Sequence, residues 1–338
     1  ALLALSHLPE SRHTREQATD LRIDLRQPLF QLGELDRILD QLREARTLAE
    51  ALDDQRRLGV VSAFLSPSLR WIGDYQQAIE SGQRALAIAV RLEDFALQVS
   101  ANYFLGQVYY VLGEYDRAIG FLRSNVESLQ GDLGRERFGM PGLPSAFSRT
   151  FLAMCLAELG QFAEGIACGE EGIRLAEAVD HPFSLAVACF GIGALYLVKG
   201  DLHRAIPVLE RGLVLCQIAP FGFPWVASPL GAAYARSGRL SEALPLLEQA
   251  VERAAAMSRN FDIQSLRLVQ LSEGYVLAGR IQDAATVAAR ALDRSREYRE
   301  RGCEAWALCL LGEIASHRDP ADVEQAEVHY CDAQALAE

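Results

Sequence analysis

Histidines, cysteines and one glycine-rich segment are the features of this sequence that could support chemistry. The segment, GDLGRERFGMPGLP (131–144), contains Arg135, Arg137 and Phe138 among four glycines. A phosphate-binding loop of the Walker type needs G-x-x-x-x-G-K-[ST] after a strand, with its lysine on the phosphates. The segment has no lysine, and the residues before it have a helical pattern, so we interpret it as a surface loop. Its two arginines and its phenylalanine make it a candidate lid over a binding site.

The six histidines and seven cysteines form no motif for a metal or a catalytic centre. No two histidines are four residues apart, as a helical zinc site would require. No two cysteines are spaced C-x-x-C, and their odd number does not suit a disulfide framework, so we expect buried thiols. A G-x-S-x-G nucleophile motif is also missing. We therefore predict no catalytic residue, no metal and no cofactor, and a chain that is not an enzyme.

Composition and charge limit the partners. The 338 residues are 50% hydrophobic and 23% charged, which is enough to form a large core. The net charge is −12 and Lys199 is the only lysine, so we expect no binding to nucleic acid or to an anionic membrane. The longest apolar run (185–198) is shorter than the ~20 residues of a membrane span, and the first residues lack the basic region of a signal peptide. These features predict a cytoplasmic protein, and we interpret the chain as part of a longer one.

An internal repeat covers the whole chain. Similar segments such as IGDYQQAI (72–79) and LGEYDRAI (112–119) recur at intervals of about 40 residues, and ADVEQAEV (321–328) is an eighth copy without the glycine. The interval from Gly113 to Gly160 alone is longer, because it contains the segment 131–144 as an insertion. The repeated glycines are Gly33, Gly73, Gly113, Gly160, Gly200, Gly238 and Gly279.

Each unit has the pattern of two helices joined by a glycine turn. An apolar helix such as 97–112 precedes the glycine, which can end a helix in the left-handed conformation at no steric cost. The second helix repeats small, large and small residues at spacings of four and three, as in Ala118, Leu122 and Asn125. This spacing places a stripe of small residues where neighbouring helices approach closely.

The turn and the helix before it match the tetratricopeptide repeat. The Gly-x-aromatic-x-x-Ala turn follows a Leu-Gly-x-x-Tyr motif, for example Leu105, Gly106 and Tyr109. The period exceeds the usual 34 residues, and HEAT-type repeats, with a more similar period but no such turn, are the second choice. We predict an all-α, right-handed superhelical solenoid of about eight tetratricopeptide-like helix-turn-helix repeats of roughly 40 residues. We expect it to form one array over residues 1–338, cut in mid-repeat at both ends, with residues 1–8 as the end of a second helix.

The first helix of each unit is expected to line the concave groove of such a solenoid. Counted from the glycine of the Leu-Gly pair, the groove positions lie three and six residues before it and one, four and five after it. Their aromatic character and few charges suit an apolar peptide, a partner helix or a small ligand, although packing between units is an equal alternative for each residue. The predicted groove residues are Arg70, Trp71, Tyr103, Gln107, Tyr110, Phe147, Met154, Phe190, Trp225, Arg236 and Glu273.

Several stretches also resemble a particular kind of repeat domain. RERFGMPGLPS (135–145), LGAAYARSGRLSEALPLLEQAVE (230–252) and the segment 54–89 are similar to the C-terminal tetratricopeptide region of bacterial STAND-type signalling ATPases, which often carry a class III adenylate/guanylate cyclase. The resemblance implies a non-catalytic sensor that binds a partner protein or peptide in its groove and regulates the ATPase and cyclase domains of the same polypeptide. A sensor for a small-molecule inducer, with a pocket in the superhelix, is the alternative. No P-loop or cyclase carboxylates are found in this sequence.

Overall fold

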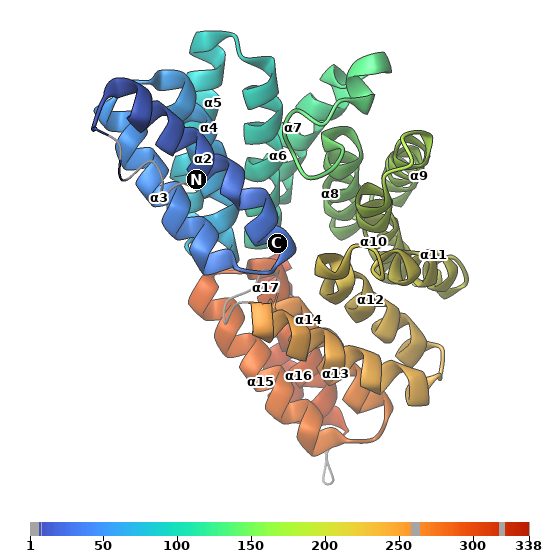
Figure 1. Cartoon of the computed structure of the whole chain (residues 1–338). Coiled ribbons are helices and arrows are strands. Elements are labelled where there is room, and N and C mark those ends of the chain that lie inside the picture. The colour runs from blue at the N-terminus through green and yellow to red at the C-terminus, as the bar shows by residue number, and fades with distance from the viewer. Residues whose placement is uncertain (1–6, 8, 258–263, 318–321, 338) are drawn as a thin grey trace.

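The computed structural model describes residues 7, 9–257, 264–317 and 322–337. Sixteen α-helices in these ranges form eight consecutive pairs, and no strand occurs there (Figure 1). The predicted all-α superhelical solenoid is therefore confirmed. The predicted helix end at residues 1–8, apart from His7, and Ala321 of the eighth turn lie outside the described residues. The pairs are α2 (Arg12–Gln31) with α3 (Leu35–Ala51), α4 (Gln55–Trp71) with α5 (Tyr75–Leu92), α6 (Phe95–Leu112) with α7 (Tyr115–Ser128), α8 (Pro144–Glu158) with α9 (Phe162–Ala178), α10 (Pro182–Lys199) with α11 (Leu202–Leu215), α12 (Phe223–Arg236) with α13 (Leu240–Met257), α14 (Gln264–Leu277) with α15 (Ile281–Tyr298), and α16 (Arg301–Ser316) with α17 (Val323–Ala337); two short 3-10 helices are η1 (Gly131–Arg135) and η2 (Pro220–Gly222).

The turn within each of the first seven pairs contains the predicted glycine. All seven glycines have φ between 72° and 82°, the left-handed region in which a side chain would be strained. In two of these pairs an aspartate caps the helix that follows. Asp74 accepts a hydrogen bond from the backbone N–H of Gln77 at 3.2 Å, and Asp201 accepts one from Arg204 at 3.3 Å.

Within three pairs, a glycine in the first helix faces a leucine 16 residues later in the second. A Cβ atom on Gly106, Gly193 or Gly231 would lie less than 3 Å from the side chain of Leu122, Leu209 or Leu247 respectively. All three leucines are fully buried. The helices of these pairs can therefore approach closely only because the glycine leaves room for the leucine.

The array closes on itself, because its seventh and eighth units contact its second and third. In Figure 1 the orange and red C-terminal helices lie directly below the blue and cyan N-terminal ones. The Tyr75 hydroxyl donates a 2.5 Å hydrogen bond to Oε1 of Glu300, and the rings of Tyr75 and Tyr298 are 6.4 Å apart. Gly302, at the start of α16, packs against the hydroxyl of Tyr115. We call these contacts the closing seam.

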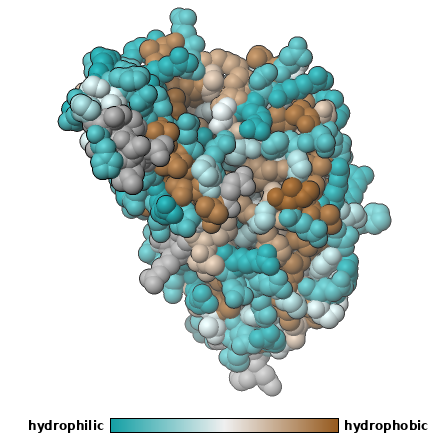
Figure 2. Space-filling view, in the orientation of Figure 1, coloured by the Kyte–Doolittle hydropathy of each residue, from teal (hydrophilic) through white to brown (hydrophobic). Residues whose placement is uncertain are grey.

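Helix α10 is the one described helix that is long and apolar enough to cross a membrane. Two thirds of its apolar window are buried inside the array, as expected for the core helix of a repeat protein. On the surface seen in Figure 2, hydrophilic residues predominate, and hydrophobic residues gather in a hollowed strip between the N-terminal units and the middle of the array.

Candidate functional site

The inner face of the array contains two adjoining compartments. The larger has a volume of about 350 Å³ and the smaller about 260 Å³, close to the lower end of the range for small-ligand pockets. Phe190 and Trp225 line both and therefore stand between them. Every one of the predicted groove residues lines a compartment, and binding of a ligand or partner by these residues stays a prediction. Arg70, Trp71, Tyr103, Gln107 and Phe147 line the larger compartment, Tyr110, Met154, Arg236 and Glu273 line the smaller one, and Phe190 and Trp225 line both.

Aromatic rings form most of the wall of the larger compartment. Phe30, near the end of α2, lies 3.9 Å from the ring of Phe221 and 5.5 Å from that of Trp71, measured between centroids. Phe183 of α10 lies 6.3 Å from Phe30 in an edge-to-face arrangement. The first unit therefore covers the compartment from the opposite side of the superhelix. Sequence reasoning missed Phe30, because its partners are up to about 190 residues away and no local pattern indicates them.

The charged side chains in the described lining of the larger compartment are all basic. Arg70 is 2% exposed, and its Nη2 donates to Oε1 of Gln107 at 3.4 Å, while Nε2 of Gln107 donates to the Tyr103 hydroxyl at 2.7 Å. Arg26 of α2 stacks its guanidinium 3.3 Å above the ring of Phe64. Burial lowers the pKa of Arg26 to about 10. Arg26 was not among the residues predicted from the sequence.

The segment 131–144 forms part of this wall. Met140 is buried, and the backbone N–H of Leu143 donates to the Ser184 hydroxyl at 2.9 Å. Of the three candidate lid residues, Arg137 alone lines the compartment. Arg135 is exposed at the end of η1, and Phe138 packs against the ring of Phe95 at 5.7 Å, so neither contributes to the lining. That the segment moves as a lid stays a prediction.

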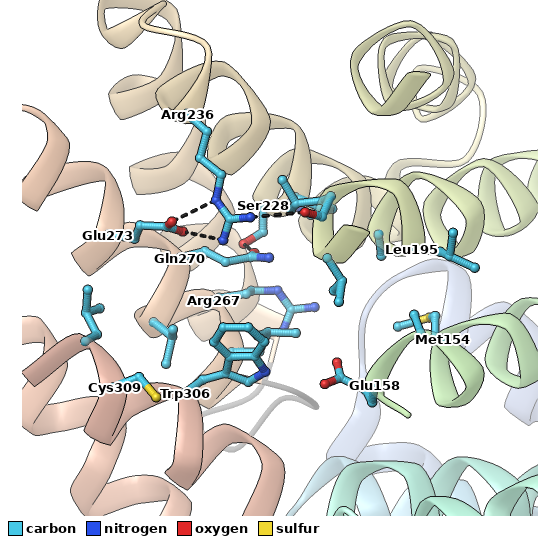
Figure 3. Close-up of a pocket in the computed structure, with 18 of the residues that line it drawn as sticks. Met154, Glu158, Leu195, Ser228, Arg236, Arg267, Gln270, Glu273, Trp306 and Cys309 are labelled. Carbon is cyan, nitrogen blue, oxygen red and sulfur yellow. Dashed lines mark hydrogen bonds and ion pairs between the residues drawn. The ribbon is translucent and has the colours of Figure 1, made fainter. Parts of the chain in front are cut away.

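The smaller compartment lies between α8, α10, α12, α14 and α16 (Figure 3). Arg236 forms a two-pronged ion pair with Glu273 at 2.7 and 3.1 Å and also donates to the carbonyl of Leu197 at 3.1 Å. Arg267 donates through Nε to the carbonyl of Pro224 at 3.2 Å. These contacts fix the positions of three charged side chains in the wall of this compartment.

Glu158, at the last position of α8, faces the same compartment. In Figure 3 its carboxylate points toward the space next to Trp306. Burial raises the pKa of Glu158 to about 7, and a hydrogen bond from Trp306 opposes this shift in part. Burial and the nearby Glu158 also hold the pKa values of Tyr110 and Tyr115 well above the usual range. Glu158 can therefore change its charge near neutral pH, which the sequence alone did not indicate.

Potential metal ligands and cysteine thiols are dispersed over the described part of the chain. Among the residues with a described placement, no three potential metal ligands gather. Burial raises the pKa of Cys189 to about 12 and that of Cys155 well above its usual value, so these thiols stay protonated at neutral pH. The expectation of buried thiols is wrong for Cys309 and Cys331, which are exposed, and Cys309 lies in the smaller compartment.

Comparisons with known proteins agree with the repeat architecture. A tetratricopeptide repeat family model matches residues 228–257, in α12 and α13. The 43 kDa receptor-associated protein of the synapse is similar in sequence: the protein from Gallus gallus is 26% identical over 172 residues, 50% of this chain and 39% of the relative. The same protein from Tetronarce californica is 29% identical over 158 residues, 46% of this chain and 36% of the relative. The chain thus matches less than two fifths of the length of these curated relatives.

Several solved structures share the fold. A Rap protein complexed with competence and sporulation factor has a TM-score of 0.61 at 12% identity and covers 95% of this chain and 98% of its own. The Rap conjugation gene regulator of plasmid pLS20, in complex with the Phr* peptide, has a TM-score of 0.63 at 12% identity, with 95% and 94% covered. The apo quorum sensor NprR from B. thuringiensis has a TM-score of 0.62 at 14% identity, with 99% and 90% covered. These matches concern the repeat array and do not extend to an ATPase or a cyclase. The chain is a tetratricopeptide-like helical repeat protein.

Proposed function

We propose that this chain is a non-catalytic sensor domain that binds a short peptide or a segment of a partner protein in its two inner compartments. One observation carries this proposal: the array closes around a lined space, and all predicted groove positions face that space. An apolar wall supplies the free energy of binding through burial, and a few fixed polar groups orient the occupant. The Arg236–Glu273 pair and the Arg70–Gln107–Tyr103 series are such groups.

A peptide is supported by the structural neighbours. Two structures with this fold are complexes, one with competence and sporulation factor and one with the Phr* peptide, and they align over nearly the whole chain. Because the identity is only 12%, the pockets themselves need not correspond. The partner is therefore proposed from the enclosed space of this chain, and the neighbours support the class of occupant.

Closure suggests how binding would be transmitted. An occupant of both compartments would contact first helices from α2 to α16, including elements on both sides of the closing seam. A ligand that binds the closed array better than an open one shifts the population toward the closed form. In this proposal, closure regulates an ATPase and cyclase module attached to the same polypeptide, in the cytoplasm, as the sequence resemblance implies.

A small-molecule inducer is the second candidate. The two volumes, about 350 and 260 Å³, are those of small-ligand pockets, and Phe190 and Trp225 narrow the space between them. Such walls suit a compact organic molecule as well as a few peptide residues. Both candidates use the same site, so one set of variants tests them.

Filling the compartments with a side chain tests the site. Ala219 lines the larger compartment and Ala194 the smaller, and both are partly exposed, so tryptophan at either position can enter the space without disturbing the core. Ala167→Trp, on the exposed face of α9, is the matched control. Thermal stabilisation by a fraction of host extract below about 1 kDa, or by a peptide fraction, should persist in Ala167→Trp and fall in Ala219→Trp or Ala194→Trp. Equal stabilisation of all four proteins would refute binding in the compartments, and the fraction that acts distinguishes a small molecule from a peptide.

A further inference from the structure

The larger compartment is basic although the protein as a whole is acidic, with a net charge of −12. Its described lining includes Arg26, Arg70, Arg137 and His181 and contains no aspartate or glutamate. We propose that this compartment binds the carboxylate of a ligand whose remaining part is apolar, with Arg26, Arg137 and His181 holding the carboxylate. This inference rests on the proposed function and names the chemistry of the ligand.

Arg137 and His181 form the first half of the site. Nδ1 of His181 accepts a hydrogen bond from the backbone N–H of Ser184 at 3.2 Å. Because Nδ1 accepts this bond, it carries no proton, so the Ser184 hydroxyl, 2.9 Å away, donates to it while accepting from the backbone N–H of Leu143. The proton of the neutral imidazole therefore lies on Nε2, which is 3.5 Å from Nη1 of Arg137. Two N–H donors so placed cannot bond to each other, and an acceptor oxygen between them satisfies both.

Local electrostatics at His181 agree with an anion site. Burial lowers the pKa of His181, and the positive charge of Arg137 lowers it further. No carboxylate is among the causes of this pKa shift. A bound carboxylate would reverse this effect and favour the imidazolium form.

Arg26 forms the second half of the proposed carboxylate site. Its Nη2 donates to the carbonyl of Gly139 at 3.3 Å, which places Arg26 beside the segment that carries Arg137. No carboxylate among the described residues forms an ion pair with Arg26, and the Asp24 charge acts on it from an exposed position on the same helix. Arg26 is partly buried, and a partly buried guanidinium gains more from a carboxylate than a fully exposed one, because the surrounding medium has a lower dielectric constant than water. Phe64 holds the guanidinium in place by stacking on its face.

The two compartments differ in charge, which orients a ligand that spans them. Glu158, Glu273 and Glu313 line the smaller compartment together with Arg236 and Arg267, whereas the charged side chains in the described lining of the larger one are all basic. Arg70 donates to Gln107 within the array and forms part of the wall of the larger compartment. A peptide would therefore place its C-terminal carboxylate in the larger compartment and its amino terminus toward the smaller one.

The test compares 2-naphthoate with 2-naphthamide, two probes of nearly the same size that differ in charge. Calorimetry with the whole chain should show 2-naphthoate binding at least about tenfold more tightly, the equivalent of about 1.4 kcal/mol. Arg26→Gln and Arg137→Gln should each reduce the affinity for 2-naphthoate about five- to tenfold and leave that for 2-naphthamide unchanged. Arg290→Gln, an exposed arginine on α15, is the matched control and should change neither.

A second readout is the titration of His181 by NMR. Saturating 2-naphthoate should raise the pKa of His181 by about one unit, and 2-naphthamide should not move it. The matched variant Arg137→Gln should raise the pKa of His181 in the free protein, because it removes the neighbouring positive charge. An unchanged His181 titration with the acid bound would overturn the assignment of His181, whatever the affinities are.

The outcomes separate the two proposals. Equal affinities for the two probes, unaffected by Arg26→Gln and Arg137→Gln, would overturn the carboxylate site but leave a ligand-binding cavity. Failure of both probes to bind at millimolar concentration would count against the cavity and the carboxylate together. Displacement of 2-naphthoate by an apolar pentapeptide with a free C-terminus, and not by its C-terminal amide, would identify a peptide as the source of the carboxylate. Displacement by aryl-alkanoic acids but by neither peptide would identify a small acid.

Discussion

The glycine–leucine packing within a unit allows a quantitative test of the fold. Gly106 lies in α6 and faces Leu122 of α7, which is fully buried. A Cβ atom on Gly106 would lie 2.6 Å from Cγ and 2.7 Å from Cδ2 of Leu122. These distances are shorter than any ordinary carbon–carbon contact, so Gly106→Ala forces the leucine or the helix to move.

The magnitudes follow from two opposing effects. Alanine in place of glycine in a helix interior stabilises by about 1 kcal/mol, and overpacking of a core costs about 1–3 kcal/mol. Gly106→Ala should therefore lower the free energy of unfolding by up to about 2 kcal/mol. Leu122→Ala should lower it by about 2–5 kcal/mol. In the Leu122→Ala background the overpacking disappears, so Gly106→Ala should stabilise, and the coupling between the two sites should be about 1–3 kcal/mol.

Urea unfolding followed by circular dichroism, together with hydrogen exchange of α6 and α7, measures this cycle. Exchange is included because repeat arrays need not unfold in one step. Gly120→Ala is the control: Gly120 lies in α7, is exposed, and a Cβ atom there would meet nothing within 4 Å. It should stabilise by about 1 kcal/mol or less. If Gly106→Ala stabilises the otherwise unchanged protein as much as Gly120→Ala does, the close packing described above is wrong.

Three further predictions concern the seam and the smaller compartment. Tyr75→Phe removes a hydrogen bond to the buried carboxylate of Glu300 at the start of α16 and should lower the free energy of unfolding by about 1.5–3 kcal/mol. The loss should appear as faster hydrogen exchange in α15 and α16, and unchanged exchange there would refute closure. Glu158 has a folded-state pKa of about 7, above that of the unfolded chain, so stability should fall as pH rises from about 4.5 to 7 and then level off. Glu158→Gln should therefore match the unsubstituted protein at pH 5 and exceed its stability by about 1–3 kcal/mol at pH 8 in urea titrations, and a gain independent of pH would contradict the shift. Ala194→Trp should slow maleimide labelling of Cys309, measured by mass spectrometry, and leave Cys331 unaffected, whereas equal rates would place Cys309 outside the compartment.

Much of this fold could be predicted because the sequence repeats. Each unit shows the same spacing of apolar residues and glycine, so a misplaced helix end in one unit is corrected by comparison with the other units. The turn glycines, such as Gly73 and Gly200, therefore identified both the helix ends and the faces of the helices. The same phase selected side chains such as Trp71 and Glu273 as groove positions, and both line a compartment.

The contacts between distant units could not be predicted, because they depend on the sum of the small rotations between successive units. Whether the superhelix closes is decided by its pitch over seven units, and no single unit encodes that sum. The contacts of Phe30 with Phe221, and of Tyr75 with Glu300, therefore could not be inferred from local pattern. Arg26 was missed for the same reason, since its place in the site follows from closure. Binding by any of these residues, and the attached signalling modules, stay proposals.

The closing seam changes how the array can be expected to respond to a local disturbance. In an open row of repeats, each unit is supported by its two neighbours, and the terminal units fray independently of the middle. In this array the late units contact the early ones at the closing seam, so the ends are not independent there. Loss of the contacts of Tyr298 or Tyr115 would therefore loosen units that are far apart in the chain at the same time. A structural change in one of these units therefore reaches the other through their shared contact, without passing through the units between them.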